Sequence, residues 1–356
     1  MSLKLKALDE QRVVITGASS GIGLETARRF ARAGARVLLV SRNDEALQAI
    51  VEEIRSIGGV AEFAVADVGD EAAVEAAADR AVSLFGGIDT WVNDAGTSTY
   101  GDVVDVPLNE HRRIFDTNYF GVVHGSLAAV KRMRERGGAL INVGSVVGDM
   151  PSPQLAAYVA TKHAVKGFTE TLRIELMHDA VPIAVTLIKP SAVNTPFKEH
   201  GKNRMGVAAA LPPPIYEPSV VADAILHAAR KPTREITVGA GGKLQALTYA
   251  MAPALGDKLF AKFGERLVQK PSDPPQRGDN LFQAGRDGEE RSDAPLPRGF
   301  SLYTLAQTHP GWMVGLGVAA GVLIAGAAAA QHAPELRRRA RPYVRRYVRP
   351  YLKRFR

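Results

Sequence analysis

The chain has 356 residues and a net charge of +8, with apolar and charged fractions that are ordinary for a globular protein. The positive charge belongs to the end of the chain: residues 332–356 carry ten Lys or Arg residues against one acid, Glu335, so the remainder is close to neutral. A nucleic-acid-binding domain needs a basic face, and we therefore expect no nucleic-acid partner. The chain has no cysteine, which excludes disulfides, thiolate catalysis and cysteine-ligated zinc. We expect no metal site.

The first two-thirds of the chain alternate between short β-branched runs and segments with helical spacing. The predicted strands are 12–16, 36–41, 60–66, 90–93, 139–143, 183–188 and 235–238. The predicted helices are 22–33, 44–56, 71–85, 109–136, 158–177 and 218–229. Apolar strands separated by helices indicate an α/β fold, a doubly wound parallel sheet covered on both faces.

The pattern changes after Gly242. Residues 244–268 predict one or two short helices with a break near Pro253, and 270–299 are rich in Pro, Gly, Asp and Arg with few large apolar residues. Such a composition is typical of a flexible linker. We therefore divide the chain into a catalytic domain (1–269), a linker (270–310), a membrane-embedded or transmembrane helix (311–331) and a basic aromatic tail (332–356).

Residues 311–330 contain no charge and, as a helix, would be about 30 Å long, enough to cross a bilayer core. The tail repeats an aromatic residue every fourth position with arginines between, a pattern that fits a membrane surface. A helix packed on protein and a disordered tail are the alternatives. Residues 1–8 lack a long apolar run, so we expect no secretory signal and a cytoplasmic catalytic domain attached to membrane lipids.

A glycine-rich turn connects the first predicted strand to the first predicted helix. It reads Gly17-Ala-Ser-Ser-Gly-Ile-Gly23. Glycines permit a sharp turn and close approach of the backbone to a pyrophosphate, which the N-terminus of the following helix attracts. The position between a strand and a helix makes this turn a predicted dinucleotide-binding site rather than an ordinary connection.

The second predicted strand ends at Ser41 and Arg42. An acid in this region binds the ribose 2′-hydroxyl of NAD, whereas an arginine accommodates the 2′-phosphate of NADP. We therefore expect NADP(H) as the cofactor, with a solvated arginine as the alternative. Asp67 ends the third strand, where it either meets the adenine amino group or caps the next helix.

Ser145 follows the fifth predicted strand, and Tyr158 and Lys162 lie one helical turn apart. Reduction of a carbonyl requires a hydride for carbon and a proton for oxygen. A free tyrosine has a pKa of about 10, and a nearby ammonium group lowers it. A serine hydroxyl can hold the carbonyl oxygen as charge develops there. The three residues therefore predict a carbonyl–alcohol oxidoreductase.

These motifs, together with Asn93-Asp-Ala-Gly96 and Asn118, resemble those of the short-chain dehydrogenase/reductase family over about residues 6–242. The resemblance implies a single Rossmann-type domain with a seven-stranded parallel sheet, to which the residues after 269 add the C-terminal helical or transmembrane extension predicted above. It implies that Tyr158 is the acid/base, that Lys162 lowers its pKa and binds the nicotinamide ribose, that Ser145 orients the substrate and that Asn118 holds a relay water. The residues expected to bind the cofactor are Gly17, Ser19, Ser20, Gly21, Ile22, Gly23, Ser41, Arg42, Asp67, Val68, Asn93, Ala95, Gly96, Tyr158, Lys162, Pro190, Val193 and Thr195.

Two positions depart from the family pattern. Asp94 stands where a second Asn is common, and Ser191 stands where Gly often follows Pro190. An acid at 94 lacks the amide donor, which affects the bonding after the fourth strand.

The family resemblance implies a homodimer or homotetramer formed through the helices 109–136 and 158–177. A small-molecule carbonyl or alcohol is the expected substrate, and the membrane segment favours a lipophilic one. The alternative function is a membrane-attached scaffold or sensor that binds NADP(H) without turnover. A third, an epimerase or dehydratase, fits the short substrate region less well.

Overall fold

The computed structural model of the protein describes residues 3–275, 278–285 and 287–309. The chain divides into two units, Met1–Thr304 and Leu305–Arg356, and the sheet and the candidate site belong to the first. The predicted membrane helix 311–331 and the basic tail 332–356 lie outside the described residues. None of the helices that the structure describes combines the length and the apolar character needed to cross a membrane.

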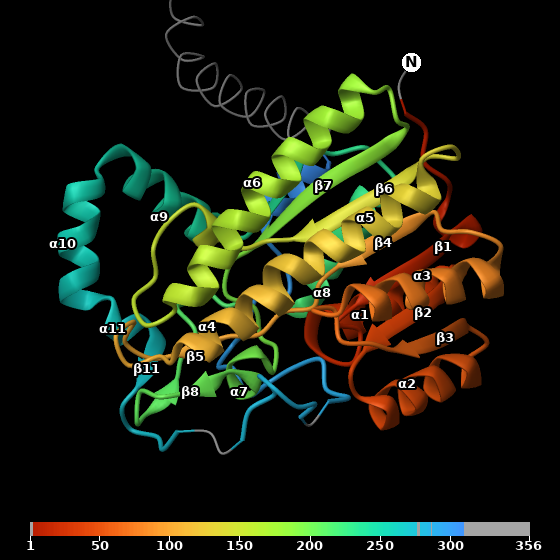
Figure 1. The fold of residues 1–356 in the computed structure, drawn as a ribbon. Coiled ribbons are helices and arrows are strands. Elements are labelled where there is room, and N and C mark those ends of the chain that lie inside the picture. Colours follow the sequence, from red (N-terminus) through yellow and green to blue (C-terminus); the bar gives the residue numbers. More distant parts are fainter. Residues whose placement is uncertain (1–2, 276–277, 286, 310–356) are drawn as a thin grey trace, which may run out of the picture. The chain divides into compact units, whose positions relative to one another are not determined.

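Seven parallel strands form one sheet in the order β10-β7-β6-β4-β1-β2-β3 (Figure 1). The strands are β1 (Arg12–Thr16), β2 (Arg36–Ser41), β3 (Val60–Val65), β4 (Thr90–Asn93), β6 (Gly138–Val143), β7 (Ile183–Pro190) and β10 (Glu235–Val238). The predicted doubly wound sheet is confirmed. Because β1 pairs with both β2 and β4, the strand order reverses at β1, and the crevice at the carboxyl ends of these strands is where such sheets bind ligands.

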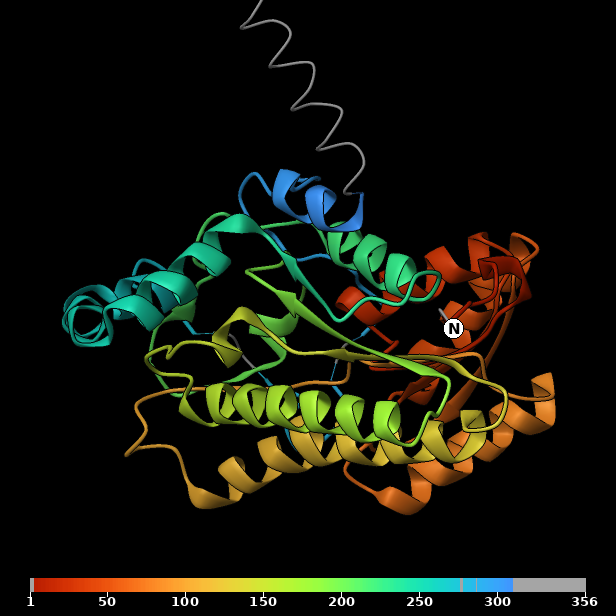
Figure 2. The ribbon, with the colours of Figure 1, turned by 90° about the horizontal axis from the view of Figure 1, so that it is seen from above.

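Helices α1, α2 and α8 cover one face of the sheet, and α3, α5 and α6 cover the other (Figure 2). The helices in the described part of the chain are α1 (Gly21–Arg32), α2 (Asp44–Ser56), α3 (Glu71–Phe85), α4 (Leu108–Phe115), α5 (Gly121–Met133), α6 (Ala156–His178), α7 (Phe197–His200), α8 (Pro218–Ala228), α9 (Ala240–Met251), α10 (Pro253–Phe263), α11 (Glu265–Val268) and α12 (Leu302–Thr308). One buried cluster joins the sheet to α1, α2 and α8, and a second joins it to α3, α5 and α6. Buried apolar side chains on both faces explain why the strand sequences read as continuous apolar runs.

Short elements lie outside the main sheet. The pairs are β5 (Thr99–Tyr100) with β8 (Lys202–Asn203), and β9 (Ala208–Ala209) with β11 (Gln269–Lys270). Short 3₁₀ turns occupy Leu8–Glu10 and Val146–Gly148. Figure 1 shows α7, β8 and α9–α11 beyond the carboxyl ends of the central strands. These segments can therefore form part of the wall of a ligand site there.

The helix predicted over 109–136 has a local change of winding. Between α4 and α5 the backbone forms a π-helical turn at Asp116–Phe120. A π turn inserts an extra residue into the helix and redirects the side chains around it, a change that helical periodicity does not reveal. Asn118 lies in this turn and is fully buried.

The residues predicted as a linker make specific contacts. Leu281 is fully buried and packs with Ile114 of α4 and Ala157 of α6. Gln269 and Lys270 pair with β9. The division of the chain at residue 270 stays a prediction, but the part of this segment that the structure describes lies against the catalytic domain.

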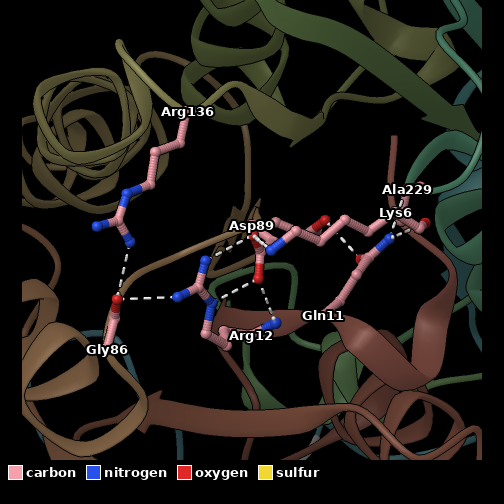
Figure 3. Close-up of polar contacts among 8 residues, drawn as sticks. Lys6, Gln11, Arg12, Gly86, Asp89, Arg136 and Ala229 are labelled. Carbon is pink, nitrogen blue, oxygen red and sulfur yellow. Dashed lines mark hydrogen bonds and ion pairs between the residues drawn. The ribbon is translucent and has the colours of Figure 1, made fainter. Parts of the chain in front are cut away.

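A charged cluster at the amino end of β1 joins four parts of the fold (Figure 3). The buried Asp89 carboxylate accepts hydrogen bonds from Arg12 Nε (2.6 Å), Arg12 Nη2 (2.8 Å), the Arg12 backbone N–H (3.0 Å) and Lys6 Nζ (2.7 Å). Gln11 Nε2 bridges Lys6 O and Ala229 O at 2.9 and 2.8 Å. Burial alone would raise the pKa of Asp89, but the hydrogen bonds from Arg12 and Lys6 outweigh it and lower the pKa.

Replacing Asp89 with Ala is expected to lower the free energy of unfolding by about 3 kcal/mol at pH 7, because Arg12 would lose its charge partner in a largely buried site. A depressed carboxyl pKa stabilises the fold above the unfolded pKa of about 3.9, and this contribution is lost as pH falls through the lower folded value. Urea denaturation at pH 7 and at pH 3 measures both effects. Equal stability losses at the two pH values, or a comparable loss in the exposed Asp105→Ala control, would refute this assignment.

Candidate active site

One cavity lies at the carboxyl edge of the sheet, at the crevice beside β1 and β4, and most of the predicted site residues line it. They are Gly17, Ser19, Ser20, Gly21, Ile22, Ser41, Arg42, Asp67, Val68, Ala95, Gly96, Ser145, Tyr158, Lys162, Pro190, Val193 and Thr195. Gly23, Asn93 and Asn118 are not on its wall. The fold thus brings together residues that are up to 178 positions apart in the chain.

The glycine-rich turn is a backbone cradle with no room for a Cβ atom at Gly17 or Gly23. Gly17 has a φ of +72°, and a Cβ atom there would be 2.8 Å from the Ala95 backbone. A Cβ atom on Gly23 would be 2.2 Å from the Gly17 carbonyl oxygen. Gly23 therefore does not touch the cavity but keeps the turn tight, and the cradle fits the pyrophosphate of a dinucleotide.

Hydroxyl groups and a guanidinium group lie together at one end of the cavity. Ser19 Oγ is 2.7 Å from Ser41 Oγ, and Arg42 follows Ser41 at the end of β2. Burial and the nearby charge of Arg113 lower the pKa of Arg42. These groups can bind an anion such as a ribose phosphate.

Asp67 does not cap the helix that follows it, so this alternative is wrong. Asp70 is the N-cap of α3 and accepts a hydrogen bond from Ala72 N–H at 2.9 Å. Asp67 instead accepts hydrogen bonds from Gly69 N–H (2.9 Å) and Arg113 Nη2 (2.5 Å) and lines the cavity. Burial would raise the pKa of Asp67, but Arg113 and Gly69 lower it.

Tyr158, Ser145 and Lys162 meet on one side of the cavity. Ser145 lies two residues past the end of β6 and precedes the 3₁₀ turn Val146–Gly148, and the other two residues lie one turn apart in α6. Lys162 Nζ donates to Val143 O at 2.9 Å and is 5.5 Å from the centroid of the Tyr158 ring. The ring packs against Phe197 with centroids 5.2 Å apart. A hydroxyl, a phenol and an ammonium group therefore face the same cavity from a rigid strand end and a long helix.

Asn93 and Asn118, the two asparagines predicted as site residues, are buried in hydrogen-bond networks. Asn118 Nδ2 donates to Thr97 O (2.9 Å) and Thr161 Oγ1 (3.2 Å), while its Oδ1 accepts from Thr97 N–H at 2.8 Å. Asn93 Nδ2 donates to Asn142 Oδ1 at 2.9 Å. Both residues thereby hold the segments behind the cavity wall, and their contact with a cofactor or a relay water stays a prediction.

The sequence predicts that Lys162 lowers the pKa of Tyr158, but in the structure the pKa of Tyr158 lies above its ordinary value. Burial raises the pKa of Tyr158 to about 12, although a hydrogen bond with Ser145 lowers it and the charge of Asp94 raises it further. Burial lowers the pKa of Lys162 to about 8, opposed by Asp94. Burial likewise raises the pKa of Asp94 to about 7, opposed by Lys162 and by the Gly23 N–H. At neutral pH the phenol is protonated and the lysine carries most of its charge.

Several cavity residues were absent from the sequence prediction. Gln245, Phe260, Leu267 and Val268 come from α9–α11. Asn280, Ala284, Gly285 and Asp287 come from the segment predicted as a linker. Composition gave no signal for these contacts, because each depends on a distant part of the chain reaching the sheet edge.

Comparisons with known proteins show the family of the chain. Residues 11–205 match the family model described as short chain dehydrogenase. The chain is 42% identical over 333 residues to the uncharacterized oxidoreductase YxnA of Bacillus subtilis, covering 92% of each chain. It is 39% identical over 191 residues to dehydrogenase/reductase SDR family member 7B of Bos taurus, covering 51% of this chain and 58% of that protein.

A solved structure is also similar. The alcohol dehydrogenase of Thermococcus sibiricus complexed with 5-hydroxy-NADP is 25% identical, with a TM-score of 0.57, over 64% of this chain and 94% of that one. The family match, the seven-stranded sheet and the relatives together show that this chain belongs to the short-chain dehydrogenase/reductase family and is an NAD(P)-dependent oxidoreductase.

Proposed function

We propose that the protein interconverts a lipophilic carbonyl compound and its alcohol, with NADP(H) as cofactor and Tyr158 as the acid/base. The observation that carries this proposal is the meeting of Tyr158, Ser145 and Lys162 at the wall of the cavity that also contains the glycine cradle. The nicotinamide ring supplies or accepts the hydride.

The protein's own residues have separate tasks in the reduction. The Ser145 hydroxyl holds the carbonyl oxygen, and Tyr158 Oη gives its proton to that oxygen as negative charge develops there. The charge of Lys162, 5.5 Å from the ring centroid, stabilises the phenolate that remains. In alcohol oxidation the same proton returns to Tyr158.

The pKa of Tyr158 favours reduction near neutral pH. A pKa of about 12 keeps the phenol in the proton-donating form. Alcohol oxidation requires phenolate, so its rate should increase with pH, whereas reduction should decline as pH rises through about 8 and Lys162 loses its proton.

Asp94→Asn is expected to move this decline of reduction to lower pH. The Asp94 charge raises the pKa of Lys162, so removing it lowers the pH at which the ammonium group is lost. The asparagine oxygen can still accept the Gly23 N–H. The pH profile of kcat/KM for carbonyl reduction measures the shift, and a profile that is unchanged or displaced to higher pH would contradict the coupling.

Arg42 supports the choice of NADP(H). It lies beside Ser41 and Ser19 at the cavity end, and a guanidinium group binds phosphate through charge-assisted hydrogen bonds. No acid occupies position 41 or 42, where NAD-binding relatives of the fold use one to hold the ribose hydroxyl.

The outer wall of the cavity supports a lipophilic substrate. It is formed largely by apolar side chains, including Met150, Leu155, Leu211, Phe260 and Leu267. Apolar walls with a few convergent polar groups are typical of sites for apolar small molecules. The three consecutive prolines 212–214 also line this region and restrict the backbone there.

Two further proposals concern association. The exposed side chains of Phe120, Leu127, Ile174 and Met177 lie on the outer sides of α5, α6 and the turn before α5, which supports a homodimer or homotetramer through these helices. Attachment to membrane lipids through residues 311–331 rests on the sequence alone.

The 356-residue chain, purified in detergent, should be assayed for NADPH consumption with carbonyls from small polar to long-chain and polycyclic compounds. Turnover confined to the lipophilic members, and absent in Tyr158→Phe, would support the proposal. Tight NADPH binding without consumption of any member would favour the scaffold alternative.

A further inference from the structure

A segment that follows the predicted catalytic domain crosses the end of the cavity where Ser19, Ser41 and Arg42 lie. We call residues 279–285 and 287–290 the strap. Its backbone is bonded to the cofactor-binding turn: Glu289 O accepts from Gly21 N–H at 2.9 Å, and Gly288 N–H donates to Ser19 O at 2.8 Å. In Figure 1 the blue part of the chain runs below α7 toward α1 and β2. The strap therefore closes one side of the cavity from outside.

The strap also engages the residues at the end of β2. The Arg42 guanidinium donates to Asn280 O and, at 3.4 Å, to Leu281 O. Asn43 Nδ2 donates to Gly285 O at 2.9 Å. With Leu281 fully buried against α4 and α6, the strap is held at both ends.

The side chain of Asp287 is directed into this end of the cavity. It is only 8% exposed, and Ser19 Oγ donates to its Oδ2 at 2.9 Å. Ser19 Oγ is in turn 2.7 Å from Ser41 Oγ. His200 Nε2 is 3.9 Å from Asp287 Oδ1, and the charge of Asp287 also acts on Arg42. A carboxylate thus lies among the two hydroxyls and the guanidinium assigned to the 2′-phosphate.

We infer that Asp287 occupies the position of the cofactor's 2′-phosphate and competes with it, so that it weakens the binding of NADP(H) relative to NAD(H). A carboxylate and a phosphate accept hydrogen bonds from the same donors, and two anions placed close together repel each other. A ribose 2′-hydroxyl, in contrast, can donate a hydrogen bond to the carboxylate. Asp287 is therefore a specificity-determining residue that opposes Arg42, and NADP(H) binds after Asp287 has left Ser19.

The inference rests on the proposed cofactor site, and it is tested by binding rather than turnover. Dissociation constants for NADPH and NADH should be measured calorimetrically with the full chain and with Asp287→Asn. The variant should bind NADPH about tenfold more tightly, because a like charge is removed. Its affinity for NADH should stay the same or fall. Glu289→Gln is the matched control, since it removes the same charge from an exposed side chain two residues away, and its NADPH-to-NADH affinity ratio should stay within twofold of wild type.

A second pair of ligands tests the effect of the ribose 2′-phosphate separately from the rest of the cofactor. Adenosine 2′,5′-bisphosphate and AMP differ only by the phosphate in question, and Asp287→Asn should improve binding of the first alone. An unchanged NADPH-to-NADH ratio in Asp287→Asn, with the variant folded by circular dichroism, would overturn the role of Asp287. Failure of the wild-type chain to bind any of these nucleotides would instead refute the proposed cofactor site itself.

Discussion

Tyr158→Phe should lower kcat/KM for carbonyl reduction on the order of a thousandfold, the contribution of a positioned proton donor. The variant loses one hydroxyl group and keeps the aromatic ring, whose packing against Phe197 needs no oxygen. The dissociation constant of NADPH should therefore change little. Steady-state kinetics of the reduction together with nucleotide titration separate the loss of chemistry from a loss of binding.

Tyr119→Phe is the matched control for this result. Tyr119 lies in the π-helical turn and packs edge-on against Phe115, Phe120 and Phe168, away from the cavity wall. Its hydroxyl has no assigned task, so kcat/KM should stay within a factor of about two to three of wild type. Equal losses in the two variants, or a Tyr158→Phe protein that retains full activity, would exclude Tyr158 as the proton donor.

Lys162→Met should lower kcat/KM at least about a hundredfold. With the 5.5 Å between Lys162 Nζ and the centroid of the Tyr158 ring taken as the charge separation, and an effective dielectric constant of about 20, a unit charge stabilises the phenolate by about 3 kcal/mol, which corresponds to roughly two orders of magnitude. The charge is needed in the transition state, when Tyr158 is losing its proton. The decline of reduction near pH 8 should also disappear, because it reports the deprotonation of Lys162.

Lys166→Met provides the comparison for the lysine variant. Lys166 lies one turn further along α6 and bonds to Asp149 at 2.6 Å rather than facing the cavity. Its replacement should leave both kcat/KM and the pH profile close to those of wild type. A Lys162→Met enzyme that keeps the alkaline decline would show that another group titrates there.

The periodicity of the sequence contained most of the information on the fold. The seven main strands were predicted with end shifts of at most two residues, since buried parallel strands form uninterrupted β-branched runs between amphipathic helices. Thr90–Asn93, for example, has the predicted bounds. The π-helical turn at Asp116–Phe120 was not predicted, because its residues continue a helical pattern and the extra residue is visible only in three dimensions.

The candidate site was predictable where its residues share a local motif. The turn from Gly17 to Gly23 and the Tyr158–Lys162 pair each lie in one short stretch of chain, so their spacing shows which side chains meet. Asn93 was expected at the cofactor and Asn118 at a relay water, and the structure places both in buried hydrogen-bond networks behind the wall. Motif spacing locates such a residue without showing which neighbour its side chain contacts.

The strap was missed for a different reason. Its composition is polar and rich in Gly and Asp, which is typical of a linker, and only Leu281 is fully buried. Its position depends on hydrogen bonds from Gly21, Ser19, Arg42 and Asn43, more than 230 residues earlier in the chain. No local pattern encodes contacts of that separation, so the opposing roles of Arg42 and Asp287 became apparent only in the fold.

The most direct test of the proposed reaction follows the hydride itself. The 356-residue chain should be incubated with a lipophilic ketone and NADPH in which both hydrogens at C4 of the nicotinamide are replaced by deuterium, and the alcohol analysed by mass spectrometry. Deuterium on the carbinol carbon, in equal amount to the NADP⁺ formed and absent with Tyr158→Phe, is the result expected. Bound NADPH that transfers no deuterium to any ketone of the panel would contradict the assignment of Tyr158, Ser145 and Lys162 to carbonyl reduction.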